Sequence, residues 1–163
     1  MEARLVEFPA TAVAMLTHRG SPATEHATVR TLVAWKLLHR FVDPLRHRHY
    51  GIHHHDPRTT RTEDYRVDFC LSLATEVPAN DAGIVPAVIP RLFCALARDV
   101  GSRTDNQAAR WLREHWLPRS GMSVGDHPPI FHYLNVGPLG QPADMITDVY
   151  LPLRGELKIP MRR

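Results

Sequence analysis

The chain has 163 residues, of which 44% are hydrophobic and 23% are charged, a composition typical of a single soluble globular domain. The net charge is only +3, and arginines alternate with acidic residues along most of the chain, which argues against a DNA-binding face with concentrated positive charge. No run approaches the roughly 18 apolar residues of a membrane span, and the N-terminus lacks a secretory signal, so we expect a cytoplasmic protein.

The first half of the chain predicts a strand, a helix and a hairpin. Residues 12–17 form an apolar stretch rich in β formers, which favours a strand. Ser21 and Pro22 then fit the N-cap and the first position of a helix with one broad apolar face. Two further runs, 50–55 and 66–73, are separated by a loop rich in arginine and threonine, and they predict a β-hairpin.

The second half repeats this order. Residues 92–100 predict a strand, Ser102 fits an N-cap, and a helix with an apolar face follows. Two more strands are predicted at 130–136 and 145–153. Between the halves, the prolines in segment 76–88 favour an extended crossing.

The two halves are related by an internal repeat. An offset of 81 positions aligns the first strand and the helix, and after one deletion an offset of 80 aligns the last strand of each half. The matched pairs include Pro9 and Pro90, Gly20 and Gly101, Ser21 and Ser102, Trp35 and Trp116, and Asp68 and Asp148. A register held over this length indicates two copies of one supersecondary unit.

The repeat predicts an α+β fold. Two β-α-β-β units bury their helix faces by forming a curved antiparallel sheet with the helices on one face, related by a tandem pseudo-two-fold repeat. We expect a single domain, 1–163, with repeat one at 5–75, a linker at 76–88, repeat two at 89–154 and a C-terminal tail at 155–163. The seam between the units is a natural place for a cleft.

Four stretches carry a family resemblance that extends from residue 5 to residue 153: VAMLTHRG, then YGIHHHDP with YRVDF, then HWLPRSG, and finally FHYLN. In order and spacing they resemble the GyrI-like effector-binding family, which is related to the small-molecule-binding domains of BmrR-type and Rob-type transcription regulators. The resemblance implies an aromatic cavity between the two repeats, which holds cationic or amphipathic compounds around a buried glutamate.

The same resemblance places the family's glutamate two residues before Tyr133, where this chain has Phe131. Without a buried anion, a cation has only ring faces to offset its lost hydration, at about 0.5–2 kcal/mol per contact. A neutral aromatic or weakly basic ligand is therefore expected as much as a cation. Because hydrolysis needs a positioned acid or base, we also lean against an enzyme and name no catalytic residue.

Strand alternation selects the candidate ligand contacts. At an offset of 81, Tyr50, Ile52 and His54 align with Phe131, Tyr133 and Asn135, and alternate residues of a strand share a face. His54 is either a neutral donor or acceptor in the cavity or a satisfied core histidine. Trp111 is added because its counterpart is Arg30, so it suits a one-sided contact. The predicted ligand-binding residues are Tyr50, Ile52, His54, Trp111, Phe131 and Tyr133.

The remaining histidines of the HHH run raise the question of a metal site. His53 and His55 are predicted to point away from the cavity, and with Asp56 they could supply three metal ligands. A solvated outer strand face is the alternative that we favour. We therefore expect neither a metal nor another cofactor.

The favoured function is a stand-alone module that binds a small hydrophobic, aromatic or cationic compound between the repeats. One alternative, also implied by the resemblance, is hydrolysis of cyclopropanoid genotoxins, with His54 or His132 replacing the missing carboxylate. Another is a gyrase-inhibitor-like module that binds a protein. We expect no direct contact with nucleic acid or membrane, and a protein partner, gyrase or a DNA-binding regulator, follows from family analogy alone.

Overall fold

Eight antiparallel strands form one curved sheet in the computed structural model, which describes residues 1–102, 105–136 and 144–157. The strand order is β1-β6-β8-β7-β3-β4-β2-β5. Most of the predicted C-terminal tail, 158–163, lies outside the described residues. Within those residues, none of the helices combines the length and the apolar character that crossing a bilayer requires.

Each half of the chain contributes four strands and one long helical segment among the described residues, and the first half also has two 3₁₀ turns, η1 (Pro22–Thr24) and η2 (Thr62–Asp64). The first half contains β1 (Arg4–Phe8), β2 (Thr11–Arg19), α1 (Glu25–Leu38), β3 (His49–His53) and β4 (Arg66–Ser72). The second half contains β5 (Val85–Ile89), β6 (Leu92–Gly101), α2 (Gln107–Trp111), the π-helical turn η3 (Leu112–Trp116), α3 (Leu117–Ser120), β7 (Ile130–Tyr133) and β8 (Met145–Pro152). Because α2, η3 and α3 follow one another without a break, they form one helical segment.

The strand order is symmetric about the central pair β7 and β3. Moving outward from that pair, β8 corresponds to β4, β6 to β2, and β1 to β5. The outermost strands are exchanged between the halves, because β1 pairs with β6 and β5 pairs with β2. The predicted α+β fold with a curved antiparallel sheet is confirmed, although each unit contains one more strand than the sequence predicted.

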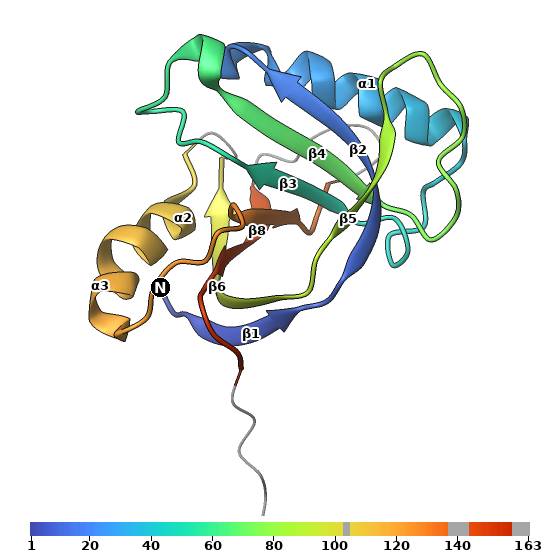
Figure 1. Cartoon of the computed structure of the whole chain (residues 1–163). Helices are drawn as coiled ribbons and strands as arrows, with labels where there is room; N and C mark the ends of the chain where they lie inside the picture. The colour runs from blue at the N-terminus through green and yellow to red at the C-terminus, as the bar shows by residue number, and fades with distance from the viewer. Residues whose placement is uncertain (103–104, 137–143, 158–163) are drawn as a thin grey trace, which may run out of the picture.

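The two helical segments pack on the same face of the sheet. The register places Leu16 opposite Phe69, and the same face continues across the sheet to Phe131 and Val149. Figure 1 shows α1 beside β2 and β4, and α2 with α3 beside β6 and β8. The helix-covered face thus carries two core clusters, one under each helical segment, with β3 between them.

The opposite face of the sheet curls around a third core cluster. Phe8 of β1 packs edge to face against Tyr50 of β3 and Tyr150 of β8, with ring centroids 5.6 and 5.0 Å apart. These contacts join strands that are distant in the sheet order. The curvature therefore buries this face without a covering helix and leaves the helix-covered face as the place for a cleft.

Candidate functional site

A pocket of about 450 Å³ opens on the helix-covered face, between the N-terminal end of α1 and the α2–η3 segment. Its floor is an aromatic pair from the two central strands. The ring centroids of His53 and Phe131 lie 3.9 Å apart, with planes inclined by 30°. Both side chains line the pocket, and Phe131 keeps only 6% of its surface exposed.

The floor is continued below by Tyr133. Its hydroxyl is hydrogen-bonded to His53 Nε2 at 3.0 Å, and its ring lies over Gly51. A Cβ atom at position 51 would stand only 2.6 Å from the Tyr133 hydroxyl oxygen. Glycine at this position is thus what allows the tyrosine to lie flat across β3.

One wall of the pocket carries a buried carboxylate. Glu25, in the first turn of α1, is only 7% exposed, and Tyr65 donates its hydroxyl hydrogen bond to Glu25 Oε1. The 3₁₀ turn Pro22–Thr24 leads into this helix, and Ser21 caps that turn, since its Oγ accepts a hydrogen bond from Ala23 N at 3.2 Å. The sequence analysis missed Glu25, because an acidic residue in a first helical turn is common for electrostatic reasons alone.

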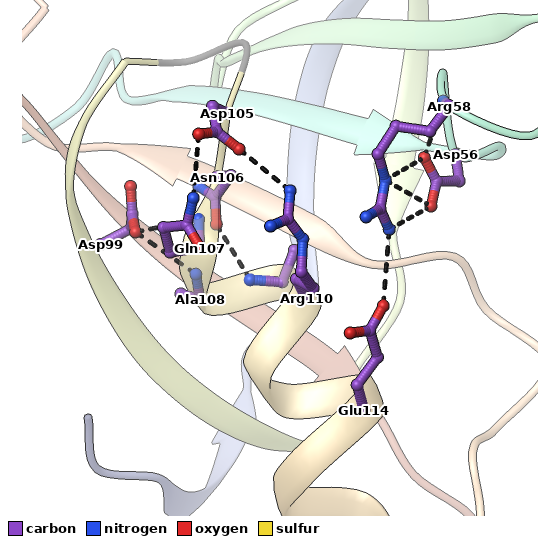
Figure 2. Close-up of polar contacts among 10 residues, drawn as sticks. Asp56, Arg58, Asp99, Asp105, Asn106, Gln107, Ala108, Arg110 and Glu114 are labelled. Carbon is purple, nitrogen blue, oxygen red and sulfur yellow. Dashed lines mark hydrogen bonds and ion pairs between the residues drawn. The ribbon is translucent and has the colours of Figure 1, made fainter.

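The opposite wall and the rim are lined by ion pairs, which Figure 2 shows. Arg58 Nη2 lies 2.7 Å from Asp56 Oδ2 and 3.7 Å from Glu114 Oε1, so it connects the β3–β4 loop to η3. Arg110 Nη2 lies 3.0 Å from Asp105 Oδ1. The hydrogen bonds from Arg58 lower the pKa of Asp56. Because these pairs are largely exposed, each contributes little to stability.

The N-terminal end of α2 is fixed to the sheet by side-chain caps (Figure 2). Asp99 Oδ1 accepts hydrogen bonds from Gln107 N at 3.1 Å and Ala108 N at 3.3 Å, and Asn106 Oδ1 accepts one from Ala109 N at 2.9 Å. Burial raises the pKa of Asp99, and the two backbone hydrogen bonds oppose that rise. This end of the pocket wall is therefore rigidly placed by the sheet.

The predicted alignment of the two repeats was wrong by one residue at β3. In the sheet Tyr50 pairs with His132 and Gly51 pairs with Phe131. At the offset of 80, Cys70 of β4 corresponds to Tyr150 of β8. Tyr50 pairs with Cys70 and Ile130 pairs with Tyr150, so Ile130 is the counterpart of Tyr50 and the offset is already 80 at β3. The deletion thus precedes β3, and a slip of one residue exchanges the two faces of a strand.

The slip moves two of the predicted contacts to the other face of the sheet. Tyr50 and Ile52 belong to the third core cluster, on the face opposite the pocket, while Trp111 packs half-buried against the second core cluster. His53, which was expected to point away, lies in the floor with Phe131. Of the predicted set, His54 and Phe131 line the pocket and Tyr133 supports its floor. Ligand contact by any of these residues stays a prediction.

His54 is held at the edge of the pocket by a buried acid. Its Nε2 donates to Asp68 Oδ2 at 2.7 Å, and Asp68 also accepts from Thr17 Oγ1 at 2.7 Å and from the Arg66 guanidinium. Burial alone would raise the pKa of Asp68, but these hydrogen bonds outweigh it and hold the pKa below its usual value. Arg66 and Asp68 lie on the same strand, and the hydrogen bond from His54 to Asp68 ties the loop after β3 to β4.

The HHH run does not assemble a metal site in the described part of the chain. No three side chains of His, Cys, Asp or Glu there are grouped so that they could hold a metal ion. His53 bonds Tyr133 and His54 bonds Asp68, so two of the three imidazoles have protein partners. What the arrangement offers chemically is a ring-floored hollow with a carboxylate in one wall.

A family model and a curated relative both match nearly the whole chain. Residues 1–154 match the GyrI-like family, described as a GyrI-like small molecule binding domain. The "Probable transcriptional regulator YgiV" of Escherichia coli strain K12 is 32% identical over 154 residues, which are 94% of this chain and 96% of that protein.

Solved structures show the same fold at low sequence identity. The crystal structure of the EcmrR C-terminal domain has a TM-score of 0.71 and 16% identity, covering 94% of this chain and 97% of that one. The structure of SAV2435 bound to tetraphenylphosphonium has a TM-score of 0.56 and 12% identity, covering 95% of each chain. On the family match and the relative together, the chain belongs to the family of GyrI-like small molecule binding domains.

Proposed function

We propose that this chain binds a small organic compound with an aromatic body in the pocket above Phe131. The observation that carries the proposal is the hollow itself, because about 450 Å³ lies within the roughly 300–1,000 Å³ of small-molecule sites. The adjoining rings of His53 and Phe131, inclined by 30°, supply an aromatic surface for a ring of the ligand.

The charges around the pocket support a ligand with a positive charge. The described lining carries four carboxylates and three guanidinium groups, from Glu25, Asp56, Asp105 and Glu114 and from Arg58, Arg110 and Arg113. Glu25 is the buried one among these carboxylates. A buried carboxylate offsets the hydration that a cation loses on binding. The position of the family's glutamate holds Phe131 in this chain, and Glu25 supplies a carboxylate from another wall. SAV2435, a protein of the same fold, is described as bound to the cation tetraphenylphosphonium.

Calorimetric titration with a matched pair of ligands tests this proposal. Tetraphenylphosphonium carries the charge, and triphenylphosphine oxide is a neutral compound with similar rings. Phe131→Ala is expected to weaken both ligands about tenfold, whereas Glu25→Gln weakens only the cation, also by about tenfold or more. Phe41→Ala and Glu63→Gln, which lie outside the pocket lining, are the matched controls. Saturable binding of neither ligand to the folded wild-type protein would refute the proposal.

A second candidate function is hydrolysis of a cyclopropanoid genotoxin, and it is supported by the same wall. Hydrolysis needs an acid or base directed at the substrate, and Glu25 with Tyr65 offers a carboxylate and a hydroxyl inside the pocket. His132, proposed from the sequence, lies on the opposite face beside Tyr50. Mass spectrometry should then detect many ring-opened products per protein, with loss of turnover in Glu25→Gln. Retention of unchanged compound would leave binding as the function.

A further inference from the structure

A second, smaller hollow lies on the same face of the sheet as the pocket. Its volume is about 30 Å³, which is room for about one or two water molecules. Its walls are mostly apolar, and they are formed by α1, by the strands β3, β4, β7 and β8, and by the residue Val136 that follows β7. The residues that line it are Val29, Leu32, Val33, His49, Tyr50, Phe69, Cys70, Tyr133, Val136 and Met145. We call this space the inner hollow.

The order of residues along β3 places the inner hollow in line with the pocket. His49 lines the hollow, Gly51 lies under the ring of Tyr133, and His53 lines the pocket. These residues alternate along one strand face, so His49 and His53 are about 13 Å apart. Helix α1 lies along both spaces, because Glu25 lines the pocket and Val29 and Val33 line the hollow.

Tyr133 stands between the two spaces. Its backbone pairs with His49 at the hollow, while its hydroxyl reaches His53 in the floor of the pocket at 3.0 Å. The ring lies against the backbone of Gly51, which has no side chain, and its edge contacts Phe131. If the ring turns away from His53, the pocket and the inner hollow join into one groove along β3 and β7.

We propose that Tyr133 is a gate that determines ligand length, and that the preferred ligands carry an unbranched alkyl chain on an aromatic or cationic head. The head occupies the pocket, and the chain passes over Gly51 into the inner hollow. The apolar walls of the hollow suit a hydrocarbon chain, whereas the rim of the pocket is charged. This inference rests on the proposed function, since it extends the same site.

The length of the chain is limited at the far end of the hollow. Lys36, one turn beyond Val33 on α1, donates a hydrogen bond from Nζ to His49 Nε2 at 2.7 Å. Both groups are polar, and Lys36 is buried. A hydrocarbon chain that reaches this pair would break the hydrogen bond between Lys36 and His49 and could not replace it. The affinity should therefore stop rising with chain length at that point.

A series of alkyltriphenylphosphonium ions tests the gate, because the head stays constant while the chain grows from methyl to butyl, octyl and dodecyl. In the wild-type protein, we expect the affinity to rise by up to about fourfold per methylene over the first positions and then to level off. Tyr133→Ala, which removes the gate, should increase the gain from methyl to octyl at least about tenfold further. All ligands are measured below the concentrations at which they aggregate.

A second variant keeps the test valid if Tyr133→Ala fails to fold. Val33→Phe fills the inner hollow and should abolish the gain in affinity from the methyl to the octyl compound. Leu37→Phe, one turn further on α1 and outside the hollow, is the matched control and should keep the gain.

Three results distinguish the outcomes. If the methyl compound binds but octyl binds equally well in the wild-type protein, the gate is wrong and the pocket proposal stands. If Val33→Phe keeps the full gain with chain length, the chain lies elsewhere and the gate is again overturned. If no member of the series binds, the proposed function falls and the gate falls with it.

Discussion

A buried hydrogen bond between Lys36 and His49 makes the stability of the fold sensitive to mild acid. A lysine ammonium can only donate, so the His49 Nε2 that accepts from Lys36 Nζ at 2.7 Å must be unprotonated. Burial first, and then the charges of Lys36 and His132, lower the pKa of His49 to about 4. Protonation of His49 would break this bond and place two positive charges side by side.

The magnitude follows from the difference between the folded and unfolded pKa values. In the unfolded chain His49 has the ordinary pKa of 6.5, and in the folded protein it is about 4. Above pH 6.5 both states are neutral at this site and there is no effect. As the pH falls below 6.5, the unfolded chain takes up a proton that the folded protein refuses, so stability decreases. The loss reaches about 2 kcal/mol at pH 5 and levels off near 3 kcal/mol below pH 4.

Urea unfolding at pH 7.5 and pH 5.0 measures this loss. His49→Gln places an amide oxygen where it can accept from Lys36 but cannot titrate, so the variant should lose about 2 kcal/mol less than the wild type between the two pH values. His26→Gln, an exposed substitution on α1, the helix that carries Lys36, is the control. Equal losses in wild type and His49→Gln would refute the reasoning, because the other titrating groups are common to both proteins.

Three other substitutions have defined outcomes. Gly51→Ala should destabilise the protein by about 1–3 kcal/mol in urea unfolding, because the new Cβ meets the Tyr133 hydroxyl at 2.6 Å, and adding Tyr133→Ala should remove most of that penalty. Asp68→Asn should cost about 3 kcal/mol at pH 7, with a smaller difference from wild type in acid, since a lowered pKa gives stability that is lost as the carboxylate protonates. Tyr65→Phe removes the donor to Glu25 and should lower stability by about 1–3 kcal/mol in the same assay; no change would show that this contact is energetically unimportant.

The internal repeat was sufficient to predict the sheet and its helix-covered face. The alternation of buried and exposed residues along a strand, and the constant offset between the two halves, both extend over whole elements and so tolerate errors at single residues. The prediction failed at the two outermost strands. Each of these shows one fully buried residue, Phe8 in β1 and Ile89 in β5, so the apolar pattern is too weak to read. Pro86 also argues against a strand unless the strand lies at an edge, which is where β5 is found.

The candidate site was predicted less well than the fold. A site depends on where single side chains point, whereas a fold depends on the apolar pattern averaged over whole strands and helices. Phe131 was placed correctly in the pocket, but the one-residue slip at β3 exchanged Tyr50 for His53. The position of a deletion within a loop leaves no trace in a self-alignment, and moving it across a strand reverses every side chain on that strand. Glu25 could not be selected, because only the folded chain brings it beside Tyr65, forty residues away.

The symmetry of the fold shows why the pocket has two unlike ends. At the repeat offsets, the counterpart of Glu25 is Asn106, which caps α2, and the counterpart of Tyr65 is Met145, which lines the inner hollow. The first half thus supplies a carboxylate and a hydroxyl where the second half supplies a helix cap and a thioether. A symmetric cavity would accept a ligand in two orientations. Here a cationic head gains from only one of them, so we expect a bound ligand to have its charge toward α1 and Glu25.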